Sequence, residues 1–137
     1  MYLVDTDVLS ALRRKHRNPE VAQWLLEQRA TDLFLSVVSI GEIERGIFQQ
    51  QRVNPAFAKS LSEWLDKLLT LYTGRILDVN LAVSRRWGQL STSVGHQSPD
   101  LLIAATALEH GLTVVTLNVR HFKPTGVSVI DPSNIAD

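Results

Sequence analysis

Short apolar segments alternate with longer helical patterns along this chain of 137 residues. Runs of apolar and β-branched residues predict strands, whereas apolar residues spaced three and four apart predict helices. Because strands that alternate with helices form a parallel sheet covered on both faces, the pattern predicts an α/β fold of three layers, α/β/α, with a short parallel central sheet. The expected strands are residues 2–5, 33–35, 75–77, 112–117 and 127–130.

Helical patterns fill the intervals between these strands. The clearest covers residues 55–72, where large apolar side chains recur at helical spacing. Residues 98–110 are apolar almost all round, which predicts a buried helix, and Gly111 is placed to end it. Further helices are expected over residues 7–15, from Pro19, from Ser39 and over residues 83–94.

The composition is that of one globular domain, which we expect to span residues 1–137. Hydrophobic residues make up 45% and charged residues 20% of the chain, which excludes a disordered polypeptide. The 14 basic and 14 acidic residues cancel. The total charge therefore does not indicate a nucleic-acid binder, although local basic patches can still bind.

Three kinds of feature are absent from the sequence, and their absence bears on the cellular compartment. The chain has no cysteine, which excludes disulfides and thiolate metal sites and is typical of a reducing environment. No signal-peptide pattern is evident at the N-terminus, and no apolar run approaches the ~20 residues that cross a bilayer. We therefore expect a cytoplasmic protein without a membrane segment.

Four oxygen-bearing side chains are expected at one edge of the predicted sheet. Asp5 ends the first strand, and Glu42 lies in the first turn of the helix that follows the second strand. Asp100 lies in the first turn of the helix before the fourth strand, and Asn118 follows that strand directly. Because ligands of parallel sheets bind outside the carboxyl ends of the strands, these four residues form a candidate site.

The chemistry of this cluster favours a divalent metal ion. Carboxylate and amide oxygens are the ligands that Mg²⁺ and Mn²⁺ prefer. Without a cation the clustered carboxylates would repel one another, and one of them would be driven to take up a proton. The sequence therefore predicts a Mg²⁺ or Mn²⁺ site at this edge.

Each of the four residues also has an ordinary structural interpretation. Ser39 and Glu42 match a capping box, in which the Glu42 side chain satisfies a backbone N–H group. Asp5 and Asp100 can stabilise helix N-termini, and Asn118 is typical of a turn. Their common placement at one sheet edge is what predicts a site.

Other polar side chains are expected beside the cluster. Thr6, Ser39 and Thr116 carry hydroxyl groups that can orient a water molecule or a phosphate, although caps and strand ends also account for them. Asp7 is interpreted as a first-turn acid of the first helix, near the site and outside its ligand set.

Four segments carry the residue pattern of a known family. They read Leu-Val-Asp-Thr-Asp-Val-Leu at residues 3–9, Ser-Ile-Gly-Glu-Ile-Glu-Arg-Gly-Ile at 39–47, Asp-Leu-Leu-Ile-Ala-Ala-Thr-Ala at 100–107 and Val-Thr-Leu-Asn-Val-Arg-His-Phe at 115–122. In this order they resemble the PIN-domain ribonucleases, and within them the VapC-like toxins of bacterial toxin–antitoxin pairs. The resemblance spans nearly the whole chain.

The resemblance implies a metal-dependent endoribonuclease that uses Mg²⁺ or Mn²⁺. Asp5, Glu42 and Asp100 match the family's acidic ligand positions. The fourth position often holds Asp in the family, and here Asn118 offers an amide oxygen without a charge. The family often carries Asp just before the aromatic residue of the last segment. This chain has His121 there, and no catalytic role is carried over to it.

The resemblance also implies RNA as the substrate, a small antitoxin whose tail wraps the groove, and a homodimer. In the mechanism that the cluster favours, a metal-activated water hydrolyses the phosphodiester bond. Because an acidic pocket repels RNA, basic residues must flank it. The densest basic run is Arg13–Arg17, and further candidates are Arg45, Arg85, Arg86 and Lys123.

Three other functions are compatible with an α/β domain of this kind. A PIN-fold nuclease of RNA processing that is not a toxin has the same site, and a non-catalytic RNA- or protein-binding module fits the uncharged Asn118. A phospho-acceptor receiver module needs an acceptor Asp near residue 55 and a Lys at the end of a late strand. Residues 49–55 and strand 112–117 lack them, which disfavours the receiver, since a fold alone does not define function.

Overall fold

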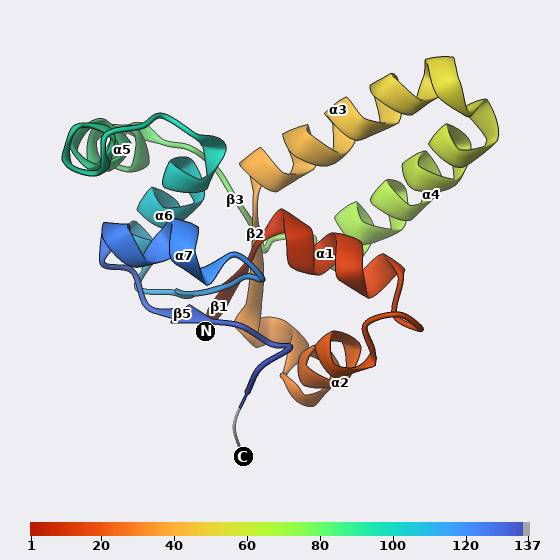
Figure 1. The fold of residues 1–137 in the computed structure, drawn as a ribbon, viewed down its shortest axis with the longest axis horizontal. Coiled ribbons are helices and arrows are strands. Elements are labelled where there is room, and N and C mark those ends of the chain that lie inside the picture. The colour runs from red at the N-terminus through yellow and green to blue at the C-terminus, as the bar shows by residue number, and fades with distance from the viewer. Residues whose placement is uncertain (136–137) are drawn as a thin grey trace.

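A five-stranded parallel sheet forms the centre of the protein (Figure 1). Its strands are β1 Tyr2–Val4, β2 Leu33–Ser36, β3 Ile76–Leu77, β4 Thr113–Val115 and β5 Val129–Ile130. They are ordered β3-β2-β1-β4-β5, each parallel to its neighbours. The computed structural model describes residues 1–135, so the last two residues of the predicted domain 1–137 lie outside the described residues. Every strand that the sequence predicts is present, with bounds that differ by at most two residues.

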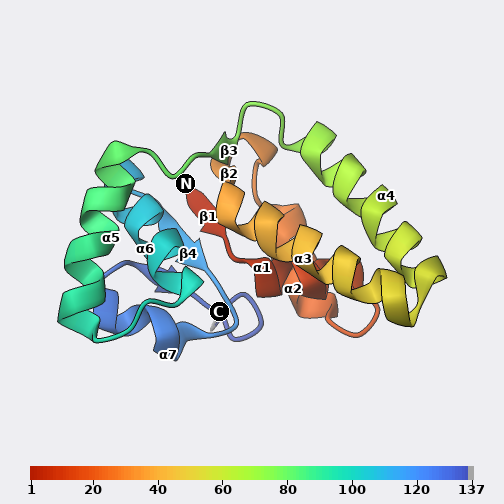
Figure 2. The same ribbon diagram turned by 90° about the horizontal axis from the view of Figure 1, so that it is seen from above.

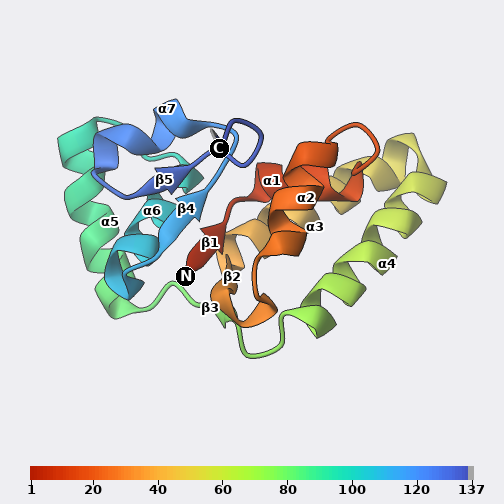
Figure 3. The same cartoon turned by 90° about the horizontal axis from the view of Figure 1, so that it is seen from below.

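Helices cover both faces of this sheet, which confirms the predicted three-layer α/β/α fold (Figures 2 and 3). On one side of β1 lie α1 Thr6–Arg13, α2 Pro19–Glu27, α3 Val37–Val53 and α4 Pro55–Leu71. On the other side lie α5 Leu81–Val94, α6 Pro99–His110 and α7 Val119–Phe122. Two short 3-10 helices cover Ala30–Asp32 and Lys123–Thr125.

The central strand β1 contributes to two hydrophobic cores. Leu3 and Val4 are both fully buried, but Val4 packs with residues of α1 to α4, and Leu3 packs with residues of α6 and α7. Successive strand residues point to opposite faces of a sheet, so a strand buried on both faces is apolar without a break. Asp5, the first residue after β1, therefore lies at the sheet edge between the two helical layers.

Helix α6 confirms the prediction of a buried helix. Leu101 and residues 103–107 are buried, and the hydroxyl of Thr106 donates to the Leu102 carbonyl within the helix. Gly111 follows with a φ of 65°, a left-handed conformation that ends helices and that glycine adopts without strain. Within residues 1–135, neither α6 nor any other helix is long and apolar enough to span a membrane.

One prediction about the helices is wrong, and one short helix is not predicted by the sequence. Helix α3 begins at Val37 and not at Ser39, because Ser36 is its N-cap and the Ser36 hydroxyl accepts a hydrogen bond from Val38 N at 3.0 Å. Residues 119–122 form α7, which the sequence pattern does not predict. A helix of about one turn is too short to show the apolar periodicity on which prediction depends.

Candidate active site

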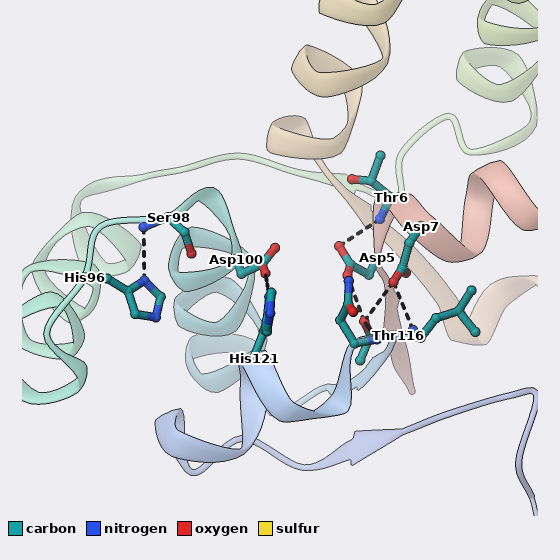
Figure 4. Close-up of polar contacts among 10 residues, drawn as sticks. Asp5, Thr6, Asp7, His96, Ser98, Asp100, Thr116 and His121 are labelled. Atoms are coloured by element: carbon teal, nitrogen blue, oxygen red, sulfur yellow. Dashed lines mark hydrogen bonds and ion pairs between the residues drawn. The ribbon is translucent and has the colours of Figure 1, made fainter.

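Asp5 lies at the carboxyl end of β1, where it is the N-cap of α1 (Figure 4). Its Oδ1 accepts a hydrogen bond from Thr6 N at 2.8 Å, and its Oδ2 accepts one from Thr116 Oγ1 at 2.9 Å. The residue is only 4% exposed. The helix-cap interpretation is therefore confirmed, but the buried bond to Thr116 shows that capping is not the whole role of this carboxylate.

Burial raises the pKa of the Asp5 carboxyl from 3.8 to about 7. Desolvation is the largest cause, and the negative charges of Asp7 and, more weakly, Asp100 act in the same direction. The hydrogen bonds from Thr116 and from the Thr6 backbone oppose the rise. Asp5, Asp7 and Asp100 therefore share one electrostatic environment at the sheet edge.

Thr116, which follows β4, links the acids to the loop before α7. Its Oγ1 donates to Asp5, lies 3.4 Å from Asp7 Oδ2 and accepts a hydrogen bond from Asn118 N at 3.0 Å. A hydroxyl carries one hydrogen, and the shorter contact, to Asp5, takes it. Because Thr116 is fully buried, this hydroxyl holds the Asp5 carboxylate in a defined orientation.

Asp7 lies in the first turn of α1, as predicted, and also reaches the loop after β4. Its Oδ2 accepts a hydrogen bond from Leu117 N at 3.1 Å. Its Oδ1 is buried and has no hydrogen-bond partner among the described residues, and burial raises the pKa of this carboxyl. Unsatisfied buried oxygens are rare in folded proteins. Asp7 is therefore closer to the site than the sequence indicates.

Glu42 contacts Thr6 and not a helix N-terminus. Thr6 Oγ1 lies 2.8 Å from Glu42 Oε1 and 2.8 Å from Ser39 Oγ. Since one hydroxyl has one hydrogen to donate, Thr6 donates to the Glu42 carboxylate and accepts from Ser39. The capping-box interpretation is wrong, because α3 begins two residues before Ser39 and Glu42 lies beyond its first turn.

Asp100 lies in the first turn of α6, as predicted, and contacts His121 of α7 (Figure 4). His121 Nδ1 is 3.0 Å from Asp100 Oδ2, and the two side chains are 57% and 23% exposed. The imidazole thus lies beside the candidate site. Sequence reasoning missed this contact, because it did not predict the helix that carries His121.

Asn118 is the N-cap residue of α7, but its side chain makes no capping hydrogen bond. Its backbone N–H donates to Thr116, which keeps the residue at the same sheet edge as Asp5. The residue is exposed, and its amide forms no hydrogen bond with residues 1–135. It therefore lies at a helix start, and its assignment as a metal ligand stays a prediction.

The donor chemistry of this edge fits a hard divalent cation. A cation would offset the repulsion among Asp5, Asp7 and Asp100 and would give the orphaned Asp7 oxygen a partner. As the side chains lie, however, no three His, Cys, Asp or Glu residues among 1–135 converge closely enough to hold a metal ion. A cation at this edge would therefore be held by fewer side chains than three of these types, with water molecules as further ligands, or would need side chains to move.

A hollow of about 220 Å³ extends from Glu42 between α1, α3 and α4. Its lining includes Arg13 and Arg14, the first two members of the predicted basic run. The Arg13 guanidinium lies 5.1 Å from the centre of the Phe57 ring, within cation–π distance. Positive charge therefore does lie next to one of the acids, as binding of RNA would require.

The chain matches known proteins over most of its length. The PIN domain family matches residues 2–126. Ribonuclease VapC14 from Mycobacterium tuberculosis is 32% identical over 94 residues, which cover 68% of this chain and 91% of that protein. Toxin FitB from Neisseria gonorrhoeae is 30% identical over 138 residues, which cover 96% of this chain and 98% of that protein.

The likeness extends to a solved structure. The crystal structure of FitAcB from Neisseria gonorrhoeae superposes with a TM-score of 0.88 at 31% identity, covering 98% of this chain and 100% of that chain. Sequence and fold therefore agree over nearly the same residues, including the sheet edge that carries the acids. This chain belongs to the PIN-domain family, and within it is similar to VapC14 and FitB.

Proposed function

We propose that the protein is a metal-dependent endoribonuclease that hydrolyses phosphodiester bonds of RNA and acts as the toxin of a toxin–antitoxin pair. The observation that carries the proposal is the buried Asp5 carboxyl, whose pKa is raised by burial and by Asp7 and Asp100. Strongly perturbed carboxyl groups at such an edge are typical of functional sites. The names of the ribonuclease and toxin relatives support the chemistry and the biological role.

Asp5, Glu42, Asp100 and Asn118 are the residues that would hold a Mg²⁺ or Mn²⁺ ion, through carboxylate and amide oxygens. When bound, such an ion polarises a phosphoryl oxygen and lowers the pKa of a bound water toward neutrality. Asn118 adds a ligand atom without a negative charge, so the negative charge of this set comes from the carboxylates of Asp5, Glu42 and Asp100.

Hydroxyl groups of the chain orient the proposed ligands. The Thr116 hydroxyl donates to Asp5, and a chain of hydroxyls from Ser39 through Thr6 donates to Glu42. Groups that orient metal ligands in this way typically contribute about 10–100-fold to metal affinity or activity. The positive charges of Arg13 and Arg14, together with other basic side chains, would hold the RNA backbone close to the acids. Such a protein would act in the cytoplasm, where its RNA substrate lies.

A small antitoxin and a second copy of this chain are the partners that we propose. The toxin name of the relative from Neisseria gonorrhoeae supports an antitoxin. For a homodimer, α3 carries two exposed large apolar side chains, Phe48 and Val53, which are 65% and 78% exposed and which contact with another chain would cover. Light scattering on the purified protein, alone and with the product of an adjacent small gene, tests both partners.

The direct test of the activity is cleavage of single-stranded and structured RNAs by the purified protein with Mg²⁺ or Mn²⁺. We expect internal cuts that EDTA abolishes. Asp5→Ala and Asp100→Asn should each lower the rate on the order of 10²-fold or more, since a catalytic ion contributes several kcal/mol. Asp66→Asn removes one exposed carboxylate from α4 and serves as the matched control, with an unchanged rate.

Other outcomes of the cleavage test would each support a different conclusion. Cleavage by Asp5→Ala at the wild-type rate contradicts the proposed site. RNA binding without cleavage by any form favours the non-catalytic module. Cleavage without growth arrest when the chain is expressed alone favours an RNA-processing nuclease that is not a toxin.

A further inference from the structure

A second hollow lies on the opposite side of the acids, between the loop that precedes α6 and helix α7. Its volume is about 630 Å³, within the range of roughly 300–1,000 Å³ that is common for ligand sites. The hollow shares Asp100 with the candidate active site. Its polar lining consists of His96, Ser98, Asp100, Arg120 and His121.

Arg120 gives this hollow a positive charge that no acid pairs within the described residues. Arg120 is exposed and forms no ion pair within residues 1–135. Asp100 is the acid among the described residues that line the hollow, and His121 already contacts it at 3.0 Å. The Arg120 charge is therefore available to a phosphate group, which guanidinium binds well.

Two imidazole rings from different segments line the same hollow (Figure 4). His96 Nδ1 accepts a hydrogen bond from Ser98 N at 3.3 Å, and His121 is held through Nδ1 by Asp100. Each ring thus has one nitrogen engaged, and both residues are exposed. Histidine rings are among the groups on which bases of single-stranded RNA stack.

We propose that this hollow binds a nucleotide of single-stranded RNA next to the scissile phosphate, with Arg120 on a phosphate and the rings of His96 and His121 against the base. The inference rests on the proposed ribonuclease function. Asp100 connects the two sites, because it belongs to the acids at the sheet edge and also lines the hollow. A strand that reaches Asp5 from this side therefore crosses the hollow.

The two hollows together place positive charge on both sides of the acids. Arg13 and Arg14 line the hollow beside Glu42, and Arg120 lines the hollow beside Asp100. An RNA strand that runs from one hollow to the other would contact the arginines of both. The acids between the two hollows repel phosphate unless a cation is bound. An acidic peptide also carries anions, but it leaves the two imidazole faces unexplained.

Binding of a fluorescein-labelled single-stranded RNA, followed by anisotropy at several KCl concentrations, tests the inference. All proteins carry Asp5→Asn, which prevents cleavage during the measurement. Arg120→Ala should raise Kd roughly three- to tenfold and lower the slope of log K against log salt by about 0.7, as expected for the loss of one contact with single-stranded nucleic acid. His96→Ala should also raise Kd, because a base loses its stacking partner.

Arg52→Ala is the matched control. Arg52 is exposed, lies in the last turn of α3, and is on the order of 24 Å along the helix from Ser36 at the site. It forms no ion pair within the described part of the chain. We expect the Kd and the salt slope of this variant to stay unchanged. Equal losses in Arg52→Ala and Arg120→Ala would overturn the inference, because only the total charge would then matter.

A neutral methylphosphonate linkage, moved one position at a time along the RNA, locates the contact. At one position beside the cut, the neutral linkage should remove the effect of Arg120→Ala, while at distant positions the effect should persist. No such position, or a loss of binding to polyglutamate but not to RNA in Arg120→Ala, would overturn the inference.

Failure of the inference and failure of the proposed function are distinguishable. Cleavage by the wild-type protein together with RNA binding that is insensitive to Arg120→Ala removes the nucleotide site and leaves the nuclease. Position-specific binding through Arg120 by a wild-type protein that does not cleave RNA supports the nucleotide site and removes the nuclease.

Discussion

At the scale of single residues, Asp5 shows that one side chain can cap a helix and also belong to an acidic site. The two carboxylate oxygens divide the roles, since Oδ1 accepts from the backbone of Thr6 and Oδ2 accepts from Thr116. The structural and functional interpretations of Asp5 are therefore compatible. Glu42 does not combine two roles in this way, because its carboxylate contacts Thr6 and does not cap the N-terminus of α3.

The raised pKa of Asp5 predicts a pH-dependent stability for the metal-free protein. The folded state holds the proton up to about pH 7, whereas the unfolded chain releases it near 3.8. The free energy of unfolding should therefore fall between these pH values and then level off. By linkage, a difference of that size is on the order of a few kcal/mol.

Urea unfolding in EDTA at pH 5 and pH 8 measures this effect. Asp5→Asn keeps an acceptor for the Thr6 N–H but has no charge to bury, so it should lose less stability than the wild type over this range. Asp66→Asn, on the surface, should behave like the wild type. The same pH dependence in all three proteins would show that Asp5 is not the titrating group.

Asn118 is the residue of the predicted ligand set that carries no charge. If its amide is a ligand, Asn118→Asp adds a negative charge to the ion's surroundings and should tighten Mn²⁺ binding, roughly tenfold. Asn118→Ala should weaken it. Isothermal titration with Mn²⁺ measures both, and identical affinities in the three proteins would assign Asn118 to a turn.

At the scale of elements, the start of α3 decides the role of three polar residues. In the sequence, the capping-box spacing of Ser39 and Glu42 favours a helix that starts at Ser39. The structure selects Ser36, because β2 runs directly into the helix and the Ser36 hydroxyl meets Val38 N. Ser39 and Glu42 are thereby turned toward Thr6 of α1.

This arrangement predicts different effects for two serine substitutions in the same helix start. Ser36→Ala removes the cap and should lower the free energy of unfolding by about 1 kcal/mol. Ser39→Ala removes the hydroxyl that donates to Thr6, so it should lower RNA cleavage by roughly 10–100-fold. Chemical unfolding and cleavage assays on both variants check the assignment. If Ser39→Ala lost more stability than Ser36→Ala, Ser39 and not Ser36 would be the residue that caps the helix.

At the scale of the whole molecule, the parallel sheet collects residues that are far apart in the sequence. Parallel strands all end at one edge, and their connecting helices begin there. Asp5 after β1, Glu42 after β2 and Thr116 after β4 lie at the same edge for this reason, and Asp100 lies there in the first turn of α6. The two cores on either side of β1 fix the position of this edge.

Because the acids repel one another without a cation, metal binding should stabilise the whole fold. At Mn²⁺ concentrations of about 100 times Kd, the free energy of unfolding should rise by about 2.7 kcal/mol and Tm by several degrees. Calorimetry with Mn²⁺ and after EDTA removes the ion measures the change. Asp5→Asn should show little response, and an equal rise in Asp5→Asn would place the ion elsewhere.

The order of strands and helices along the chain, and the acids at their ends, can be read from the amino-acid sequence. These features are encoded locally, in apolar periodicity, in prolines at helix starts and in Gly111 at a helix end. Only the tertiary structure decided which groups the acids contact. The pairs Asp7 with Leu117 and Asp100 with His121 join distant segments, and such contacts depend on packing and side-chain rotation, which no local pattern encodes.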